Sequence, residues 1–217
     1  MLKYRVALAS CTEAATAAPN AHIEMQALVH SLRKCNVSAS VVPWDCTVTL
    51  WQQYDAVILC QTWDYIDKIN EFNAWTSEIT QISALLNSAA IVKWNLNKTY
   101  LKDLEQEGIP IVPTEYLSAS SLTVQTIDHF QSQKGQIVIK PSIGCDASSI
   151  ETFETFTPMA LTHVNSLLNM GQERVLLQPF LSSISTVGEL SLIYLQGRFS
   201  HAVRKYPKAG DFRVQER

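Results

Sequence analysis

The first ninety residues alternate between strand-like and helix-like segments, and this pattern limits the fold more than any other feature. Apolar recurrence every three or four positions predicts helices over residues 23–34 and 66–86. Short β-branched or apolar runs predict four strands, at residues 4–9, 38–42, 56–60 and 90–92. Strands joined by helices in this way form a parallel sheet, so the sequence predicts a Rossmann-like α/β domain.

The loop after the first predicted strand excludes one common ligand of such sheets. It reads Ser10-Cys11-Thr12-Glu13 instead of the glycine-rich Gly-x-Gly-x-x-Gly turn. Open parallel sheets bind ligands at the carboxyl ends of their strands. Without the glycine turn that lets a pyrophosphate approach the backbone, a dinucleotide is not expected there.

A change in composition marks a domain boundary. The chain has five tryptophans, none of them after residue 94: Trp44, Trp51, Trp63, Trp75 and Trp94. We therefore predict a first domain over residues 1–94. Residues after 94 predict a mixed α+β arrangement. Helices are expected at 98–107, 122–130 and 157–170, and strands at 136–139, 149–153 and 175–178. Residues 189–195 and 198–203 are expected to form a hairpin.

The residues from Val138 to Ala147 read Val-Ile-Lys-Pro-Ser-Ile-Gly-Cys-Asp-Ala. Lys140 ends a predicted buried strand, and a small polar loop follows in which Gly144 can adopt dihedral angles closed to other residues. A cation beside exposed loop amides suits phosphate oxygens. Lys98, in the first turn of a predicted helix, opposes the helix dipole and would fit an anion in front of it. The alternative is that both lysines are ordinary solvated side chains.

Charge and cysteine usage exclude several classes. The formal net charge is −3 and no long basic run occurs, so nothing supports a nucleic-acid partner. The apolar runs are too short for a membrane span, and Met1 leads directly into a strand without a signal-peptide pattern. The five cysteines form no CxxC pair, which favours a reducing, cytoplasmic location, and no metal-binding spacing of histidines is present.

Several short motifs, in this order, resemble those of the ATP-grasp superfamily. They are Asn97-Lys98-Thr99-Tyr100-Leu101, Ile139-Lys140-Pro141, Gln178-Pro179-Phe180-Leu181, Gly188-Glu189 and Gly210-Asp211-Phe212-Arg213. The chain is most similar to the branch that contains prokaryotic glutathione synthetase, ribosomal-protein glutamate ligases and the cycloserine-pathway ligase. The segment Trp63-Asp64-Tyr65, followed by a helix with Phe72 and Trp75, looks like that last subgroup.

The resemblance implies a nucleotide-binding lobe over residues 95–180 and the start of a second lobe over 181–217. Lys98 and Lys140 would contact the phosphates of ATP, and the loop from Ser142 to Ala147, with Gly144, would cover them through its amides. Gln178 stands where the family often has a glutamate that faces the adenine amino group. The backbone of Pro179, Phe180 and Leu181 would form the hinge, and Glu189 would accept hydrogen bonds from the ribose. Arg204, Lys205 and Arg213 would face the transferred phosphoryl group or the acylphosphate.

The resemblance further implies an ATP-dependent carboxylate–amine ligase that forms an acylphosphate and acts on a small amino acid or peptide, with a homo-oligomer as one expectation. Acid selectivity would come partly from the loop of residues 61–65, although Trp63 could instead pack the domain junction. In the family, Mg²⁺ ligands follow the Gly-Asp-Phe-Arg motif, whereas this chain ends at Arg217. We therefore expect a truncated second lobe, no metal ligands here, and an inactive chain.

Two other classes stay open. A non-catalytic nucleotide-binding or interaction module would keep Lys98 and Lys140 without catalysis. A Rossmann-like binding domain unrelated to ATP-grasp would bind nucleotide equally well after Lys140→Ala.

Overall fold

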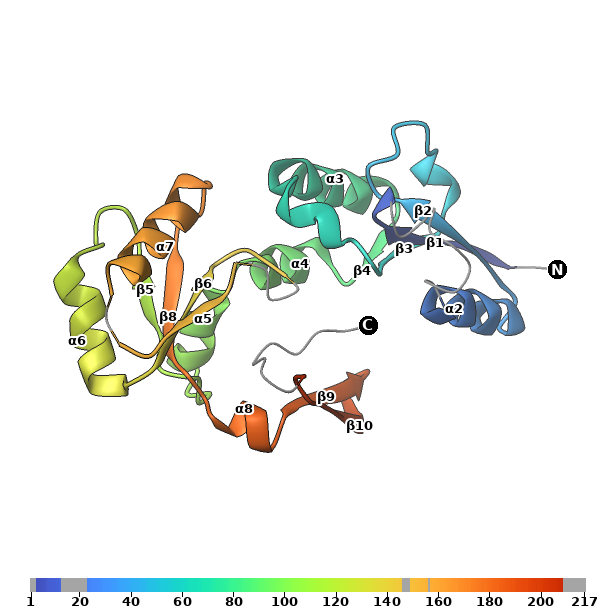
Figure 1. The fold of residues 1–217 in the computed structure, drawn as a ribbon. Helices are drawn as coiled ribbons and strands as arrows, with labels where there is room; N and C mark the ends of the chain where they lie inside the picture. Colours follow the sequence, from blue (N-terminus) through green and yellow to red (C-terminus); the bar gives the residue numbers. More distant parts are fainter. Residues whose placement is uncertain (1–2, 13–22, 146–148, 156, 209–217) are drawn as a thin grey trace. The chain divides into compact units, whose positions relative to one another are not determined.

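The chain forms two compact units, Met1–Leu96 and Asn97–Arg217 (Figure 1). The computed structural model describes residues 3–12, 23–145, 149–155 and 157–208. The first unit is built on a parallel sheet and the second on antiparallel sheets. The predicted α/β class, with a Rossmann-like domain followed by an α+β part, is confirmed.

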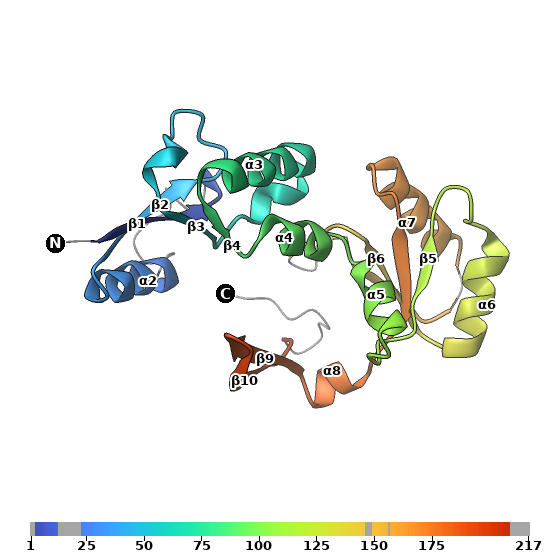
Figure 2. The same ribbon diagram turned by 180° about the vertical axis from the view of Figure 1, so that it is seen from behind.

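The first unit has a four-stranded parallel sheet in the order β2-β1-β3-β4. Its helices lie on both faces (Figures 1 and 2). Alternation along β1 explains this: Val6 and Leu8 pack on Met25 of α2, while Ala7 and Ala9 face the cluster that holds α3. The elements are β1 (Tyr4–Ser10), α2 (Ile23–Lys34), β2 (Val37–Pro43), η2 (Trp51–Gln53), β3 (Ala56–Leu59), η3 (Trp63–Ile66), α3 (Ile69–Ile82), β4 (Ala84–Leu86) and α4 (Ala89–Leu96).

The fourth strand lies earlier than the sequence predicts. The predicted helix of residues 66–86 ends at Ile82, and Ala84–Leu86 forms β4 beside β3. The predicted strand at 90–92 is wrong, because these residues belong to α4. A three-residue strand cannot be distinguished from one more helical turn by periodicity, and here the extended Ser83 separates the two elements.

The second unit contains an antiparallel sheet in the order β5-β8-β6-β7. Ile137 and Ile139 of β6, with Val175 and Leu177 of β8, pack on helices α6 and α7. β5 is not among the predicted strands. The elements are α5 (Tyr100–Gln106), β5 (Glu115–Leu117), α6 (Val124–Lys134), β6 (Ile137–Pro141), β7 (Glu151–Phe153), α7 (Pro158–Asn169) and β8 (Val175–Pro179).

A short helix, α8 (Ser183–Thr186), leads into a separate hairpin of β9 (Glu189–Leu195) and β10 (Arg198–Lys205). Gln196 and Gly197 both have positive φ, the geometry of the tight turns that match the twist of a hairpin. The predicted hairpin is confirmed, with β10 two residues longer than expected. In the part of the chain that the structure describes, no helix is long and apolar enough to cross a membrane.

Candidate functional site

Two half-buried lysines, Lys98 and Lys140, lie close enough near the end of β6 for the charge of Lys98 to lower the pKa of Lys140. Burial, and then the positive charge of Lys98, lowers the pKa of Lys140 from 10.5 to about 8. Burial also lowers the pKa of Lys98, against an opposing effect of Cys145. The Lys140 ammonium makes no hydrogen bond or ion pair with any described residue. Two like charges held together with so little compensation destabilise each other, and a bound anion would relieve that cost.

Lys98 lies just before α5 and not, as predicted, in its first turn. The Asn97 side chain accepts a hydrogen bond from the Thr99 amide at 3.0 Å, which fixes the turn. The Lys98 Nζ atom donates to the carbonyl oxygen of Gly144 at 2.8 Å. The lysine therefore reaches the loop that follows Lys140, and the structure brings Lys98, Lys140 and Gly144 together.

The start of that loop is bonded to its own surroundings. The Ser142 amide donates to the Arg174 carbonyl at 3.2 Å, and the Ile143 amide donates to Gln172 Oε1 at 3.0 Å. These two amides are therefore engaged within the protein, and the structure does not leave them for the predicted role of covering phosphates. The end of the predicted loop, Ala147, lies outside the described residues.

Gly144 lies close to the ring of Pro141. A Cβ atom built at this position would lie 3.1 Å from Cγ of Pro141, tighter than ordinary van der Waals contact. Its φ lies outside the left-handed range that favours glycine. The predicted reason for the glycine, unusual dihedral angles, is therefore wrong, and the close approach of Pro141 replaces it.

Gln178 lies on the same face of the sheet as Lys140. The helices α6 and α7 pack on the face that carries Ile137 and Ile139, so the alternate residues face the other way. Val138 pairs with Gln178, and Lys140 pairs with Leu176. Gln178 and Lys140 are thus about 7 Å apart along the strand direction, since each residue rises about 3.4 Å.

The side-chain amide of Gln178 has a defined orientation. Its Nε2 atom donates to Thr114 Oγ1 at 2.8 Å, and the Thr114 hydroxyl donates to the Val112 carbonyl at 2.7 Å. A hydroxyl has one hydrogen, so Thr114 must accept from the glutamine nitrogen. The Gln178 side chain is largely buried, and its Oε1 atom makes no hydrogen bond with any other described residue. In the adjoining hinge, the Phe180 amide donates to Gln136 at 2.8 Å, Pro179 pairs with Ile137, and the Leu181 side chain is exposed.

The other predicted residues lie on the hairpin. Glu189 and Lys205 face each other across β9 and β10, and Arg204 donates to the Tyr206 hydroxyl at 3.3 Å. Gly188 has φ +83°, and a Cβ atom there would lie 2.5 Å from the Lys205 carbonyl oxygen, so only glycine fits. Arg213 lies outside the described residues.

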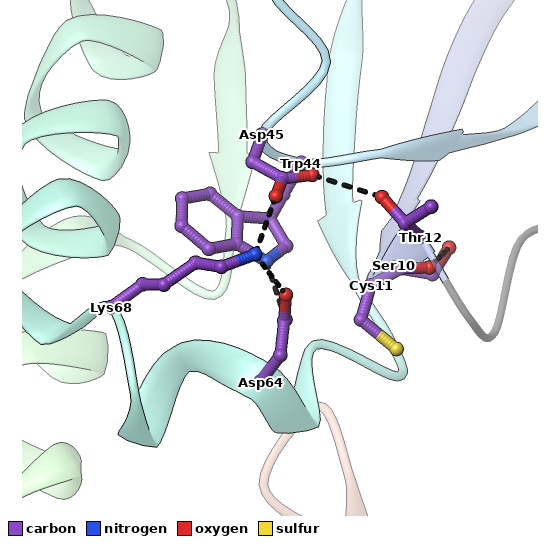
Figure 3. Close-up of polar contacts among 7 residues, drawn as sticks. All are labelled: Ser10, Cys11, Thr12, Trp44, Asp45, Asp64 and Lys68. Atoms are coloured by element: carbon purple, nitrogen blue, oxygen red, sulfur yellow. Dashed lines mark hydrogen bonds and ion pairs between the residues drawn. The ribbon is translucent and has the colours of Figure 1, made fainter.

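A second polar cluster lies in the first unit, where β1 and β2 end (Figure 3). Lys68 Nζ lies 2.7 Å from Asp45 Oδ2 and 2.9 Å from Asp64 Oδ2. Trp44 Nε1 donates to Asp64 Oδ1 at 2.7 Å, and Thr12 Oγ1 donates to Asp45 Oδ1 at 3.3 Å. The cluster connects η3 to the ends of two parallel strands, the edge where such sheets carry their sites.

The charges of this cluster stabilise one another. Hydrogen bonds from Lys68 to Asp45 and then Asp64 raise the pKa of the lysine. Burial alone would raise the pKa of Asp45, but the hydrogen bond and charge of Lys68 outweigh it, and the net shift is downward. Asp64 belongs to the Trp63-Asp64-Tyr65 segment, in which Trp63 is exposed. The spacing of four residues between Asp64 and Lys68 is the one sequence signal that could have predicted this ion pair.

Thr114 and Gln172, which orient groups of the lysine site, carried no sequence signal. Thr114 and Gln172 contact their partners across 64 and 29 residues of chain, respectively. Among the described residues, no group of three histidine, cysteine, aspartate or glutamate side chains could hold a metal ion.

Two sequence-family models match the chain in succession. Residues 6–87 match the family described as "D-cycloserine synthetase DcsG, N-terminal domain", and residues 109–215 match "Prokaryotic glutathione synthetase, ATP-grasp domain". The cycloserine biosynthesis protein DcsG of Streptomyces lavendulae is 28% identical over 186 residues, which cover 84% of this chain and 62% of that protein. The chain thus spans less than two thirds of the length of this relative.

Solved structures show the same fold. The crystal structure of D-cycloserine synthetase DcsG matches with a TM-score of 0.86 and 26% identity, over 97% of this chain and 72% of that chain. D-alanyl-alanine synthetase A from Vibrio cholerae matches at 0.64 with 13% identity, over 92% and 66%. D-alanine–D-alanine ligase from Bacillus anthracis, complexed with ATP, matches at 0.62 with 12% identity, over 97% and 68%.

Proposed function

Because the chain belongs to the ATP-grasp superfamily, we propose that its second unit binds ATP and that the protein is an ATP-dependent ligase. The reaction joins the carboxylate of a small amino acid or related molecule to an amine through an acylphosphate. The observation that carries the proposal is the pair of half-buried ammonium groups, Lys98 and Lys140, at one strand end. A triphosphate supplies the negative charge that this pair lacks.

Lys140 and Gln178 lie on the same face of the sheet, and we propose that the nucleotide runs from one to the other. The phosphates lie at Lys140 and Lys98, and the base lies toward Gln178, two residues back along the ladder. The free acceptor Oε1 of Gln178 suits the 6-amino group of adenine and not the 6-oxo group of guanine or hypoxanthine. Glu189 is proposed for the ribose, with the backbone of Pro179, Phe180 and Leu181 beside the base.

The chemistry calls for further positive charge. A carboxylate that attacks a phosphoryl group is itself an anion, so cations that neutralise and position the two reactants supply much of the catalysis. We assign that role to Arg204, Lys205 and Arg213. Mg²⁺ would supply part of this positive charge, although the described residues include no group of three histidine, cysteine, aspartate or glutamate side chains that could bind it.

The first unit is proposed to contribute to substrate selectivity. The relatives' names point to amino-acid chemistry: one is a D-cycloserine synthetase and others are D-alanine–D-alanine ligases. In this chain the segment of residues 61–65 and the Lys68 cluster lie at the carboxyl ends of the parallel strands. A D-amino acid or a close derivative is therefore the first substrate class to try.

Titration calorimetry of the 217-residue chain with ATP, with and without Mg²⁺, tests the proposal. We expect saturable one-site binding of ATP and no comparable heat from AMP, because the lysine pair binds the outer phosphates. Absence of ATP binding under both conditions would contradict it. Phosphate release with ATP and D-amino acids tests the separate prediction that this chain alone is inactive; release would refute that prediction, and binding without release fits the non-catalytic alternative.

Thr114→Val should weaken base selectivity. The valine keeps the side-chain shape but removes the hydroxyl that fixes the Gln178 amide, so the amide can turn and present its nitrogen to a 6-oxo purine. We expect the preference for ATP over ITP to fall by about tenfold, since one hydrogen bond contributes about 1–1.5 kcal/mol. Affinities for both nucleotides measure the effect, and Thr162→Val on the exposed face of α7 is the control.

Location and assembly are also proposals. The family relatives and the scattered cysteines support a cytoplasmic protein. A homo-oligomer would show as a mass above 24.3 kDa in light scattering of the purified chain.

A further inference from the structure

The side chain of Gln172 pairs with a backbone peptide of the loop after β6. Its Oε1 atom accepts from the Ile143 amide at 3.0 Å, and its Nε2 atom donates to the Ile143 carbonyl at 3.0 Å. The Ser142 hydroxyl also donates to Oε1, at 3.3 Å. One side-chain amide thus satisfies both polar groups of one loop residue, as a neighbouring β-strand would.

The same short segment is held from a second side. The Lys98 amide donates to the Ser142 carbonyl at 2.8 Å, and the Lys98 ammonium donates to the Gly144 carbonyl at 2.8 Å. Ser142 itself is fully buried, and its amide donates to Arg174. Residues 142–144 are therefore fixed between the turn after α7, which carries Gln172, and the turn before α5.

We infer that Gln172 is a positioning residue that holds residues 142–144, at the start of the loop after β6, in the conformation that binds phosphate before the nucleotide arrives. The inference rests on the proposed function, since it assigns the loop to phosphate. Fixing one residue of backbone costs about 1–2 kcal/mol, and a loop that is already ordered avoids this cost at binding. The Ile143 peptide sets the direction of the chain into Gly144, whose carbonyl in turn holds the Lys98 ammonium. Gln172 thereby acts on residues 142–144 and, through the Gly144 carbonyl, on the Lys98 ammonium.

Two substitutions separate the hydrogen bonds of Gln172. Gln172→Leu keeps the approximate size of the side chain and removes both bonds to Ile143. Gln172→Glu keeps an acceptor for the Ile143 amide but places a second acceptor against its carbonyl. Gln133→Leu on α6 is the matched control, because that glutamine is exposed and, among the described residues, its side chain bonds to His129 of its own helix.

Hydrogen exchange at the Ile143 amide and ATP affinity from calorimetry are measured on the full 217-residue chain. With Gln172→Leu we expect exchange to quicken at least tenfold and ATP affinity to fall about five- to thirtyfold, whereas the control changes neither. With Gln172→Glu we expect the Ile143 amide to stay protected from hydrogen exchange, because the glutamate still accepts its hydrogen bond. A general loosening of the turn after α7 would remove this protection in both variants. If the leucine variant does not fold, the glutamate variant carries the test and must bind ATP at least threefold more weakly.

The outcomes distinguish a wrong role for Gln172 from a wrong function for the protein. Wild-type affinity in Gln172→Leu, with a wild-type protein that binds ATP, overturns the role of Gln172 and leaves the proposed function intact. Equal loss of protection in the leucine and glutamate variants also overturns it, because the pairing with Ile143 would then be incidental. If the wild-type chain binds no ATP, the proposed function and the inference fall together.

Discussion

Lys140→Met lowers the affinity for ATP by about thirtyfold or more and at the same time stabilises the ligand-free protein. A charge-assisted bond to a phosphate contributes about 2–3 kcal/mol, and a change of 2 kcal/mol is about thirtyfold in affinity. Without a ligand, the same ammonium is half-buried beside Lys98 and has no counter-charge among the described residues. Its removal should therefore raise the free energy of unfolding by roughly 1–2 kcal/mol, after allowance for partial exposure to solvent.

The pH dependence has a defined sign. In the folded chain the pKa of Lys140 is lowered to about 8, against 10.5 in the unfolded chain. Between these values the unfolded state binds more protons, so the stability of the ligand-free protein rises as the pH increases from about 8 to 10.5. ATP prefers the protonated lysine. Its affinity should be constant below about pH 8 and fall by up to tenfold per pH unit above it.

Calorimetry and thermal unfolding across pH 6.5–9.5 would measure both effects. Lys134→Met is the matched control, because that lysine ends α6 and its side chain is exposed. The control should bind ATP like the wild type and keep its pH dependence. Lys140→Met should lose the changes in stability and affinity above about pH 8 that come from Lys140. A Lys140→Met chain that binds ATP normally would refute the proposed site and would show that the nucleotide binds elsewhere on the chain.

Local patterns predicted the elements whose length and periodicity were clear. The helix Ile23–Lys34 has the predicted ends, and the hairpin follows from two alternating runs around Gln196-Gly197. The error at Ala84–Leu86 has a physical cause: so short a strand exists because β3 offers it an edge to pair with, and that edge is not encoded locally. The strand Glu115–Leu117 escaped prediction for the same reason, since it depends on β8.

The two lysines of the candidate site could be predicted from local sequence patterns, but the neutral residues around them could not. Lys98 and Lys140 stand out because each is a charged residue next to an apolar or helical run, Lys98 just before α5 and Lys140 in the last part of β6. Thr114 and Gln172 do not stand out, because their importance lies in hydrogen bonds to residues far along the chain. Sequence reasoning finds groups that can touch a ligand more readily than the neutral side chains that orient those groups.

The largest expected effect on stability is at Trp44 in the first unit. Its side chain is 2% exposed, and its ring lies 5.1 Å from that of Phe72 in an edge-to-face contact and 5.8 Å from that of Trp75. Its Nε1 atom also donates to Asp64. Trp44→Ala removes the core contacts and the bond together, and we expect a loss of about 3–5 kcal/mol in the free energy of unfolding.

Trp44→Phe divides that loss into its two parts. Phenylalanine keeps much of the apolar contact but cannot donate to Asp64, so the bond alone should account for about 1–3 kcal/mol, the cost of a bond to a charged group. The Asp64 carboxylate then keeps Lys68 as its partner, and the cluster in Figure 3 is weakened without being dismantled. Trp63→Ala, at an exposed position of the same segment, is the control and should cost less than about 1 kcal/mol.

Denaturant unfolding in the presence and absence of ATP connects this prediction to the function. A ligand stabilises the unit that binds it, so ATP should shift the unfolding transition of the second unit and thereby identify it. Trp44→Ala should shift the transition that ATP leaves unchanged, because its contacts lie within Met1–Leu96. A Trp44→Ala chain with an unaltered transition would contradict the assigned core. A single transition that both ATP and the substitution move would show instead that the two units unfold as one cooperative body.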